Sequence, residues 1–276
     1  MKNIKRYSQL FENNQELTQE QKNWLDKCTK YGNWSVNPRT GLVDVDGGFD
    51  CYNLGLKDFK GVRFGQVSRN FNCSNNSLTS LEGAPQSVGG DFDCSDNELK
   101  SLEGVPQSVS GYFSCSHNEL KSLEGLPAGF RVGVGFSCSH NELESLKGLP
   151  DGFKVGGYFS CAHNNLKSLK GLPDGFMVGT DFNCSYNEPK SLDGLLDGLP
   201  EGFSVGRSFV CDYSERSIER VVKRMGDKKI SLEQAVAEVW EGLPEEDQAY
   251  LAKHNPDLTD EEKRIYRAIE LNMKRR

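Results

Sequence analysis

The most constraining feature of this chain is a repeat marked by cysteine. Eight of its nine cysteines are separated by 22, 21, 21, 23, 23, 23 and 27 residues, and most stand in copies of F-x-C-S-x-N-x-L-x-S-L. Residues 42–48, LVDVDGG, are a candidate for a further, degenerate copy. Repeats of this length typically stack as a solenoid in which each repeat contacts only its neighbours. We therefore predict a parallel β-solenoid of about eight rungs, paired at roughly 4.8 Å.

Each position of the repeat has a predicted place in the rung. Phe and Cys alternate, so both point to the inner side of a strand, and the two following leucines, such as Leu120 and Leu123, point back into the core. An asparagine follows each cysteine by three residues, where a buried amide can bond otherwise unpaired backbone groups. Val132 and its equivalents fill the back of the rung. The predicted asparagine ladder consists of Asn76, Asn97, Asn118, Asn141, Asn164 and Asn187.

The cysteines themselves do not form close pairs such as CxxC, which a zinc site or a disulfide framework would show. One cysteine per rung instead indicates a small buried side chain that stays reduced, as in a cytosol. The 29 glycines and a hydrophobic content of only 36% are in keeping with a thin core and many turns.

The ends of the chain differ from the repeat. Residues 18–30 begin with Thr18 and Gln21, a capping-box pattern, and place Trp24, Leu25 and Cys28 on one helical face. We predict a helical N-terminal cap over residues 1–41, to which Trp34 contributes, a solenoid over 42–213, and a small α-helical C-terminal region over 214–276. For that last region a cap, a cap that also binds a partner, and an independent active domain all stay open.

The rung resembles two known groups of proteins. Its pattern is similar to the short leucine-rich repeats of secreted bacterial effectors, with Phe and Cys in place of two leucines. LTSLEGAP at residues 78–85 and VGGDFDCS at 88–95 more closely resemble a group of phage-encoded repeat proteins. The resemblance covers roughly residues 40–213. It implies a leucine-rich-repeat-type fold, a viral origin, a location in the cytoplasm of an infected bacterium, and a binding role without a reaction.

The outward positions beside Phe and Cys predict a partner-binding surface, because the strand face is the usual contact surface of a solenoid. Tyr112 and Tyr158 are candidate aromatic anchors, and acidic residues at one end suit a basic partner. A histidine column two residues after cysteine borders this surface. The predicted contact residues are Asp91, Asp93, Tyr112, Ser114, His117, His140, Tyr158, Ser160, His163, Asp181 and Tyr186.

Catalysis, metals and cofactors find no support in the sequence. It contains no P-loop, G-x-S-x-G or H-E-x-x-H motif, and no Asp or Glu with matching spacing completes a metal shell around the aligned histidines. No run of about 18 apolar residues predicts a membrane span, and no apolar stretch follows the basic N-terminus as in a secretory signal. A net charge of −7 argues against nucleic acid as the main partner.

The sequence thus predicts a protein that is not an enzyme and needs no cofactor. It is expected to bind and modulate or inhibit a host protein, for which a defence component is one candidate. Two alternatives stay open. One is a structural component of a virion or its assembly, and the other is nucleic-acid binding through basic residues of the 214–276 region, such as Arg216 and Arg220. The oligomeric state, monomer or dimer, is left undecided.

Overall fold

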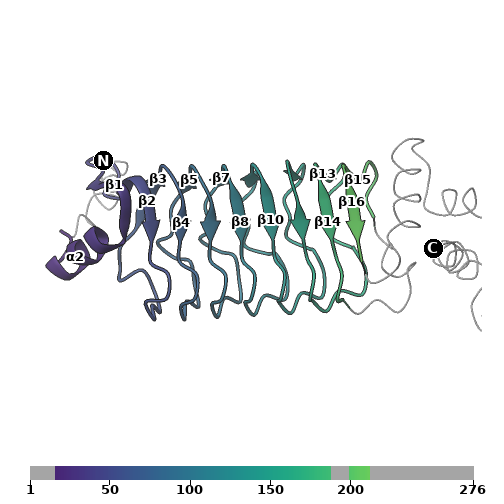
Figure 1. Ribbon diagram of the computed structural model, residues 1–276, viewed down its shortest axis with the longest axis horizontal. Coiled ribbons are helices and arrows are strands. Elements are labelled where there is room, and N and C mark those ends of the chain that lie inside the picture. The colour runs from purple at the N-terminus through teal and green to yellow at the C-terminus, as the bar shows by residue number, and fades with distance from the viewer. Residues whose placement is uncertain (1–15, 188–198, 212–276) are drawn as a thin grey trace, which may run out of the picture.

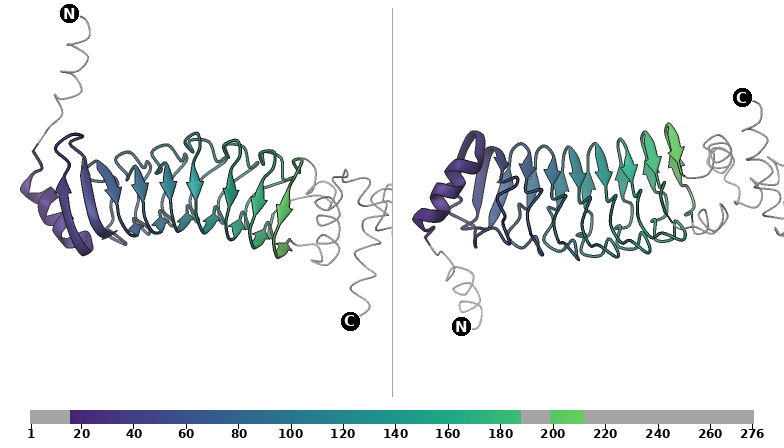
Figure 2. Two further views of the ribbon diagram at one scale, coloured as in Figure 1. Left: turned by 90° about the horizontal axis from the view of Figure 1, so that it is seen from above. Right: turned by 60° about the horizontal axis from the view of Figure 1, so that its bottom comes forward.

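The computed structural model describes residues 16–187 and 199–211, which form an elongated parallel β-solenoid (Figure 1). Successive turns stack side by side along the long axis, as Figure 2 shows from two further directions. The solenoid has about seven turns, bounded by eight strands that begin with the strand at residues 43–50. The degenerate copy at residues 42–48 is therefore a genuine rung, and the predicted parallel solenoid is confirmed.

Two rows of strands run along the solenoid and diverge from β2 (Val43–Asp50), which spans both. We call them the Val row and the Phe row after their inward residues. The Val row is β3 (Phe64–Val67), β5 (Ser87–Val88), β7 (Ser108–Val109), β9 (Arg131–Val132), β11 (Lys154–Val155), β13 (Met177–Val178) and β15 (Ser204–Val205). The Phe row is β4 (Phe71–Asn72), β6 (Phe92–Asp93), β8 (Tyr112–Ser114), β10 (Gly135–Ser137), β12 (Phe159–Ser160), β14 (Asp181–Asn183) and β16 (Ser208–Val210).

The strands pair in register with the repeat. Phe71 lies opposite Phe92, 21 residues later, and Phe136 lies opposite Phe159, 23 residues later. Identical inward residues therefore stack on one another: the rings of Phe71 and Phe92 are 5.6 Å apart and nearly parallel, with an interplanar angle of 8°. These phenylalanines, the cysteines two residues after them and the leucines of the return are all buried, as predicted.

A second row of phenylalanines fills the wider turns. The return of a 21-residue turn reads EGVPQSV at 103–109, whereas the next reads EGLPAGFRV at 124–132, which is two residues longer. The added space holds Phe130, whose ring stacks on Phe153 at 5.9 Å and packs edge-on against Phe113 at 5.3 Å. The row continues through Phe176 and Phe203, all buried. The extra residues thus widen the core from this turn onward.

Each turn is tied to the previous one by its asparagine. The Nδ2 of Asn118 donates to the backbone oxygens of Cys94, Cys115 and Ser116 at 3.1–3.2 Å, and its Oδ1 accepts from the N–H of Leu99 at 2.9 Å. The same four bonds recur at Asn97, Asn141 and Asn164. Buried backbone groups without partners are costly, so the amide satisfies groups that the turn leaves unpaired. The predicted asparagine ladder is confirmed.

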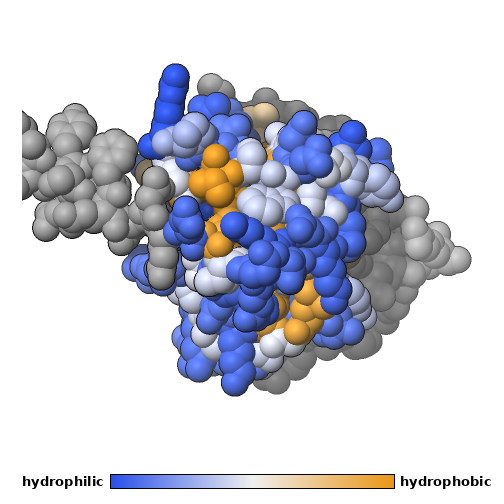
Figure 3. Space-filling view, turned by 90° about the vertical axis from the view of Figure 1, so that its left-hand side faces the viewer, coloured by the Kyte–Doolittle hydropathy of each residue, from blue (hydrophilic) through white to orange (hydrophobic). Residues whose placement is uncertain are grey.

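The N-terminal end is covered by a helix and a strand. α2 (Gln19–Cys28) begins with the predicted capping box of Thr18 and Gln21 and buries Trp24, whose ring packs edge-on against Phe49 at 5.2 Å. β1 (Thr29–Val36) then pairs antiparallel with β2, a strand that the sequence prediction of a purely helical cap missed. Trp34 lies on β1 and packs against the core, as predicted. The end surface is largely hydrophilic with small hydrophobic patches (Figure 3), so the cap covers the apolar end of the stack.

The predicted α-helical region at residues 214–276 lies outside the described residues. Within the described part of the chain, no helix is long and apolar enough to cross a membrane.

Replacing Asn118 by Ala is expected to lower the free energy of unfolding by about 3 kcal/mol, because several buried backbone groups lose their partner at once. Lys121→Ala, an exposed change in the same turn, is the matched control and should cost less than about 0.5 kcal/mol. Urea unfolding followed by circular dichroism measures both. A loss below about 1 kcal/mol for Asn118→Ala would show that water replaces the amide without penalty.

The nine cysteines are buried in the structure, and burial raises the pKa of Cys28 to about 11 and that of Cys73 and Cys94 well above the ordinary value. Because the thiolate is the reactive form, a thiol reagent at pH 8 should modify fewer than about one thiol per native chain. In urea all nine should react. Rapid reaction of several thiols in the native protein would contradict the stacked core.

Candidate functional site

The candidate site is the strand face, which we define as the outward residues of the Phe-row strands together with the residues that directly precede and follow these strands. In β8 the central Phe113 is buried, Tyr112 is exposed and Ser114 is half-buried. A buried phenylalanine followed by a half-buried residue recurs in β10, β12 and β14, and the strands pair in register. Outward residues from successive turns therefore form straight columns.

Tyr112 and Tyr158 meet across an intervening turn. Their ring centroids are 5.5 Å apart with an interplanar angle of 31°, although their strands are separated by β10. The residue between them is Gly135, which is buried, and a Cβ there would lie 2.6 Å from Tyr158 Cε1 and 2.8 Å from Tyr112 Cδ1. Only glycine leaves room for the rings to close over this turn. The tyrosines that the sequence predicted as separate anchors thus form one aromatic clasp.

Burial affects the chemistry of the clasp. It raises the pKa of the Tyr158 hydroxyl, and the nearby Tyr112, Asp91 and Asp93 raise it further. The hydroxyl stays protonated at neutral pH and can donate a hydrogen bond to a partner.

The two predicted acids at the N-terminal end of the surface have structural partners. Asp91 accepts a bond at Oδ1 from the backbone N–H of Tyr112 at 2.8 Å and at Oδ2 from Nδ2 of Asn70 at 3.1 Å. Asp93 accepts at Oδ1 from the N–H and the hydroxyl of Ser95 at 2.9 and 2.6 Å. Asp91 thus fixes the start of β8, and Asp93 fixes the turn that follows β6. Both carboxylates also contribute negative charge to this end of the surface. A further acid, Asp181, begins β14 and is half-buried.

A chain of serine hydroxyls follows the clasp. It runs from Ser116 to Ser137 at 2.8 Å, from Ser137 to Ser139 at 3.4 Å and from Ser139 to Ser160 at 2.7 Å, and it begins at Ser114, 3.3 Å from Ser116. Ser114 and Ser160 were predicted site residues, whereas Ser116 and Ser139 were missed. The alternation S-C-S in the repeats FSCSHN was the available signal, since both serines flank one inward cysteine.

The predicted histidine column is a stack of rings. His117 and His140 lie 4.1 Å apart, His140 and His163 4.0 Å, and His163 and Tyr186 4.2 Å, all within 12° of parallel. Each of these residues has φ of +53° or +54°. The left-handed region is enriched in Asn, Asp and His, and Asn75 and Asp96 occupy the same column in earlier turns with φ of +55° and +53°. The turn geometry therefore accounts for most of the residue choice.

The stacked rings cannot converge on one ion, because parallel imidazoles direct their in-plane nitrogen lone pairs along parallel lines. Within the described residues, no cluster of three His, Cys, Asp or Glu side chains could hold a metal ion. Burial, and then the neighbouring His117 and His163, lower the pKa of His140. The lowered pKa favours the neutral form of His140, at the centre of this flat stack of rings.

Together these groups form a surface for non-covalent contact. It offers an aromatic clasp, a row of hydroxyls that donate and accept hydrogen bonds, and a flat ring stack, all on rigid in-register strands. Whether its residues contact a partner stays a prediction. Comparison with protein-family models, with curated proteins and with solved structures found no match to this chain.

Removing a like-charged neighbour should raise the pKa of His140. His117→Asn is the change, because asparagine already occupies this left-handed position at Asn75. NMR titration of the imidazole signals measures the shift, and Tyr186→Asn, which leaves both neighbouring histidines in place, should not move it. The folded protein has a lower His140 pKa than the unfolded chain, so it binds this proton more weakly. The contribution of His140 to the free energy of unfolding is therefore present at a pH above the ordinary histidine pKa and is lost as the pH falls through the folded pKa. An unchanged or lower pKa in His117→Asn would contradict the coupling.

Proposed function

We propose that this protein is an interaction module that binds another protein through its strand face. The observation that carries the proposal is the clasp of Tyr112 and Tyr158 over Gly135. Tyrosine is enriched at binding hot spots because it combines a large apolar surface with a hydroxyl group. Here the two rings are already held in place, so little side-chain freedom is lost on binding.

The surroundings of the clasp indicate the chemistry of the partner. The hydroxyl row from Ser114 to Ser160 suits polar backbone or side-chain groups, and Asp91 and Asp93 make the N-terminal side of the surface negative. A partner with an apolar group for the clasp and a basic patch beside it fits this arrangement.

We further propose that the solenoid is of the leucine-rich-repeat type and encoded by a phage, and that its partner is a host protein that it modulates or inhibits in the cytoplasm of the infected bacterium. Support comes from the resemblance of residues 78–85 and 88–95 to phage-encoded repeats, which is an analogy from sequence. The elongated, rigid stack of turns also favours a second function, that of a spacer within a virion or its assembly (Figure 1). The third reading, nucleic-acid binding through residues 214–276, lies outside the described residues.

Affinity purification from bacterial lysate tests the proposal with the double variant Tyr112→Ala/Tyr158→Ala. The expected result is one stoichiometric protein with the wild type and at least about a tenfold loss with the variant, since truncating a hot spot costs upward of about 1.4 kcal/mol. Tyr31→Ala is the matched control, because Tyr31 is a fully exposed tyrosine (88%) on β1, away from the strand face.

Two results would contradict the proposal. If the double variant and Tyr31→Ala retain the partner equally, binding uses another surface. If no partner is found and the protein is instead a stoichiometric part of purified virions, the structural function is correct.

A further inference from the structure

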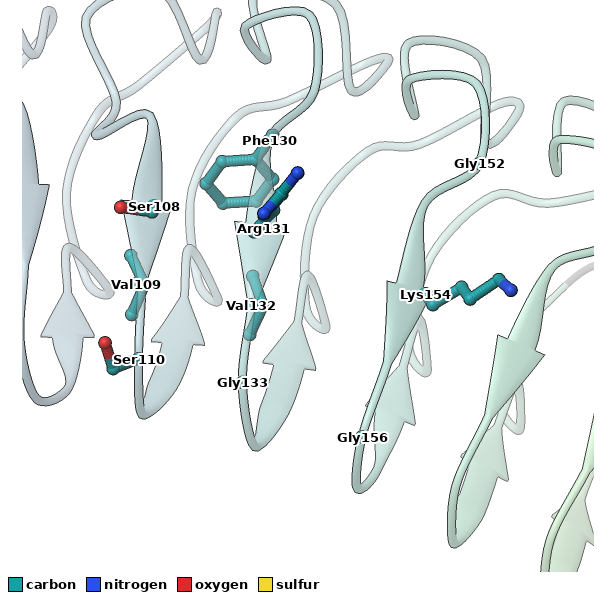
Figure 4. A pocket seen from close by; sticks show the side chains of 10 residues that line it. All are labelled: Ser108, Val109, Ser110, Phe130, Arg131, Val132, Gly133, Gly152, Lys154 and Gly156. Carbon is teal, nitrogen blue, oxygen red and sulfur yellow. The ribbon is translucent and has the colours of Figure 1, made fainter.

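A second surface with different chemistry lies on the Val row. An open hollow of about 670 Å³ is bordered by Ser108 and Ser110 of one turn, Arg131 and Gly133 of the next, and Lys154 and Gly156 of the third (Figure 4). These residues belong to the Val row and not to the Phe row that carries the clasp, and they lie on β7, β9 and β11 and the corners that follow them.

The hollow forms where the solenoid widens. Ser108 belongs to the last return of the short form, and Arg131 to the first return that is two residues longer. Gly133 and Gly156 follow β9 and β11 at the corner, and at Gly133 a Cβ would overlap the backbone oxygen of Ser110. Close stacking of the corners thus requires residues without side chains. The two glycines leave the backbone beside Arg131 and Lys154 uncovered by side chains.

The hollow carries two positive charges on adjacent strands. Val132 pairs with Val155, so Arg131 and Lys154, which precede them, are neighbours on adjacent strands. Like charges side by side on a sheet are destabilising. Neither cation takes part in an ion pair in the part of the chain that the structure describes, and no carboxylate lines the hollow. In a chain of net charge −7, the hollow is therefore a local excess of positive charge.

Hydrogen-bond donors complete the site. Ser108 and Ser110 line the hollow on the turn next to Arg131; Figure 4 shows their hydroxyls directed toward the preceding turn, so a rotation about χ1 would bring them to an anion held by Arg131. Neither hydroxyl makes a hydrogen bond among the described residues. A guanidinium group, an ammonium group and two hydroxyls can all donate, and the guanidinium fork matches the geometry of two oxygens on one phosphorus or carbon.

We propose that this hollow binds a phosphate monoester. Arg131 would hold two phosphate oxygens, Lys154 would neutralise the second negative charge, and the serine hydroxyls would donate to the remaining oxygen. A dianion satisfies both like-charged side chains at once, which a single carboxylate does not. This site is independent of the protein-binding function proposed for the Phe row.

Isothermal titration calorimetry of the full chain with free phosphoserine, at pH 7.5 and low salt, tests the site. The wild type should bind one equivalent with a dissociation constant below about 1 mM. The double variant Arg131→Gln/Lys154→Gln should bind at least about tenfold more weakly. The control Lys121→Gln/Lys167→Gln removes the same charge from exposed positions on the return face, the segments that lead from each Phe-row strand to the next Val-row strand. It should match the wild type. Arg131→Lys keeps the charge but lacks the fork, and an intermediate affinity is expected.

The source of the phosphate is resolved by a second titration with a phosphoserine peptide. Tighter binding of the peptide than of free phosphoserine would identify a phosphorylated protein, and equal binding a small metabolite, and both results support the site. Absence of saturable binding up to about 10 mM would overturn it. Equal weakening in both double variants, or equally tight binding of the unphosphorylated peptide with glutamate in place of phosphoserine, would also overturn it.

Discussion

The structure depends on a buried asparagine amide that joins each turn to the one before it. At the point where the chain leaves a strand of the Phe row, backbone groups of two turns face one another without ladder partners. One side chain with two donors and one acceptor satisfies four of them, as at Asn118. This bonding holds the turn in one geometry and keeps neighbouring turns in register. The left-handed residue at the preceding position, such as His117, is a consequence of the same tight turn.

Registered stacking turns a linear repeat into surfaces. A residue that recurs at one position becomes a column, and the inward columns of Phe, Cys, Leu and Val make a continuous core. The outward residues are not constrained by the core and differ from turn to turn. These differences give the two rows different surface chemistry. The Phe row carries the tyrosine clasp, the hydroxyl row and the ring stack, whereas the Val row carries the cationic hollow. A rigid scaffold that needs little ordering on binding suits contacts on both sides.

Much of the fold could be predicted because the positions that recur in every repeat are the positions that are buried. The inward direction of Phe, Cys and Leu, the role of asparagine and the helix beginning at Thr18 all follow from spacing and residue type. β1 was missed because TKYGNWSV has no alternating apolar pattern, and its place is set by the open edge of β2. The inner row that starts at Phe130 was missed because its phenylalanine belongs to an insertion and not to the shared motif.

The candidate site was predictable as a set of columns but not as a set of contacts. Tyr112 and Tyr158 are 46 residues apart, and their meeting depends on the missing side chain of Gly135 between them. Likewise, Asp91 and Asp93 look like free charges in the sequence, whereas the structure shows them bonded to Tyr112 and Ser95. The hollow of the Val row lies where a short return is followed by a return that is two residues longer, and this change has a structural effect only when the two turns are stacked. In each case the missing information is how residues of different turns meet.

The most direct test of the central claim, that the strand face contacts a protein partner, is site-specific photo-crosslinking. A photoreactive benzoylphenylalanine replaces Ser137, which lies beside the clasp, and in a separate variant replaces Lys121 on the return face. Position 137 is expected to give one discrete adduct with a bacterial protein, and position 121 none. An adduct only from position 121, or the same adduct from both, would contradict it.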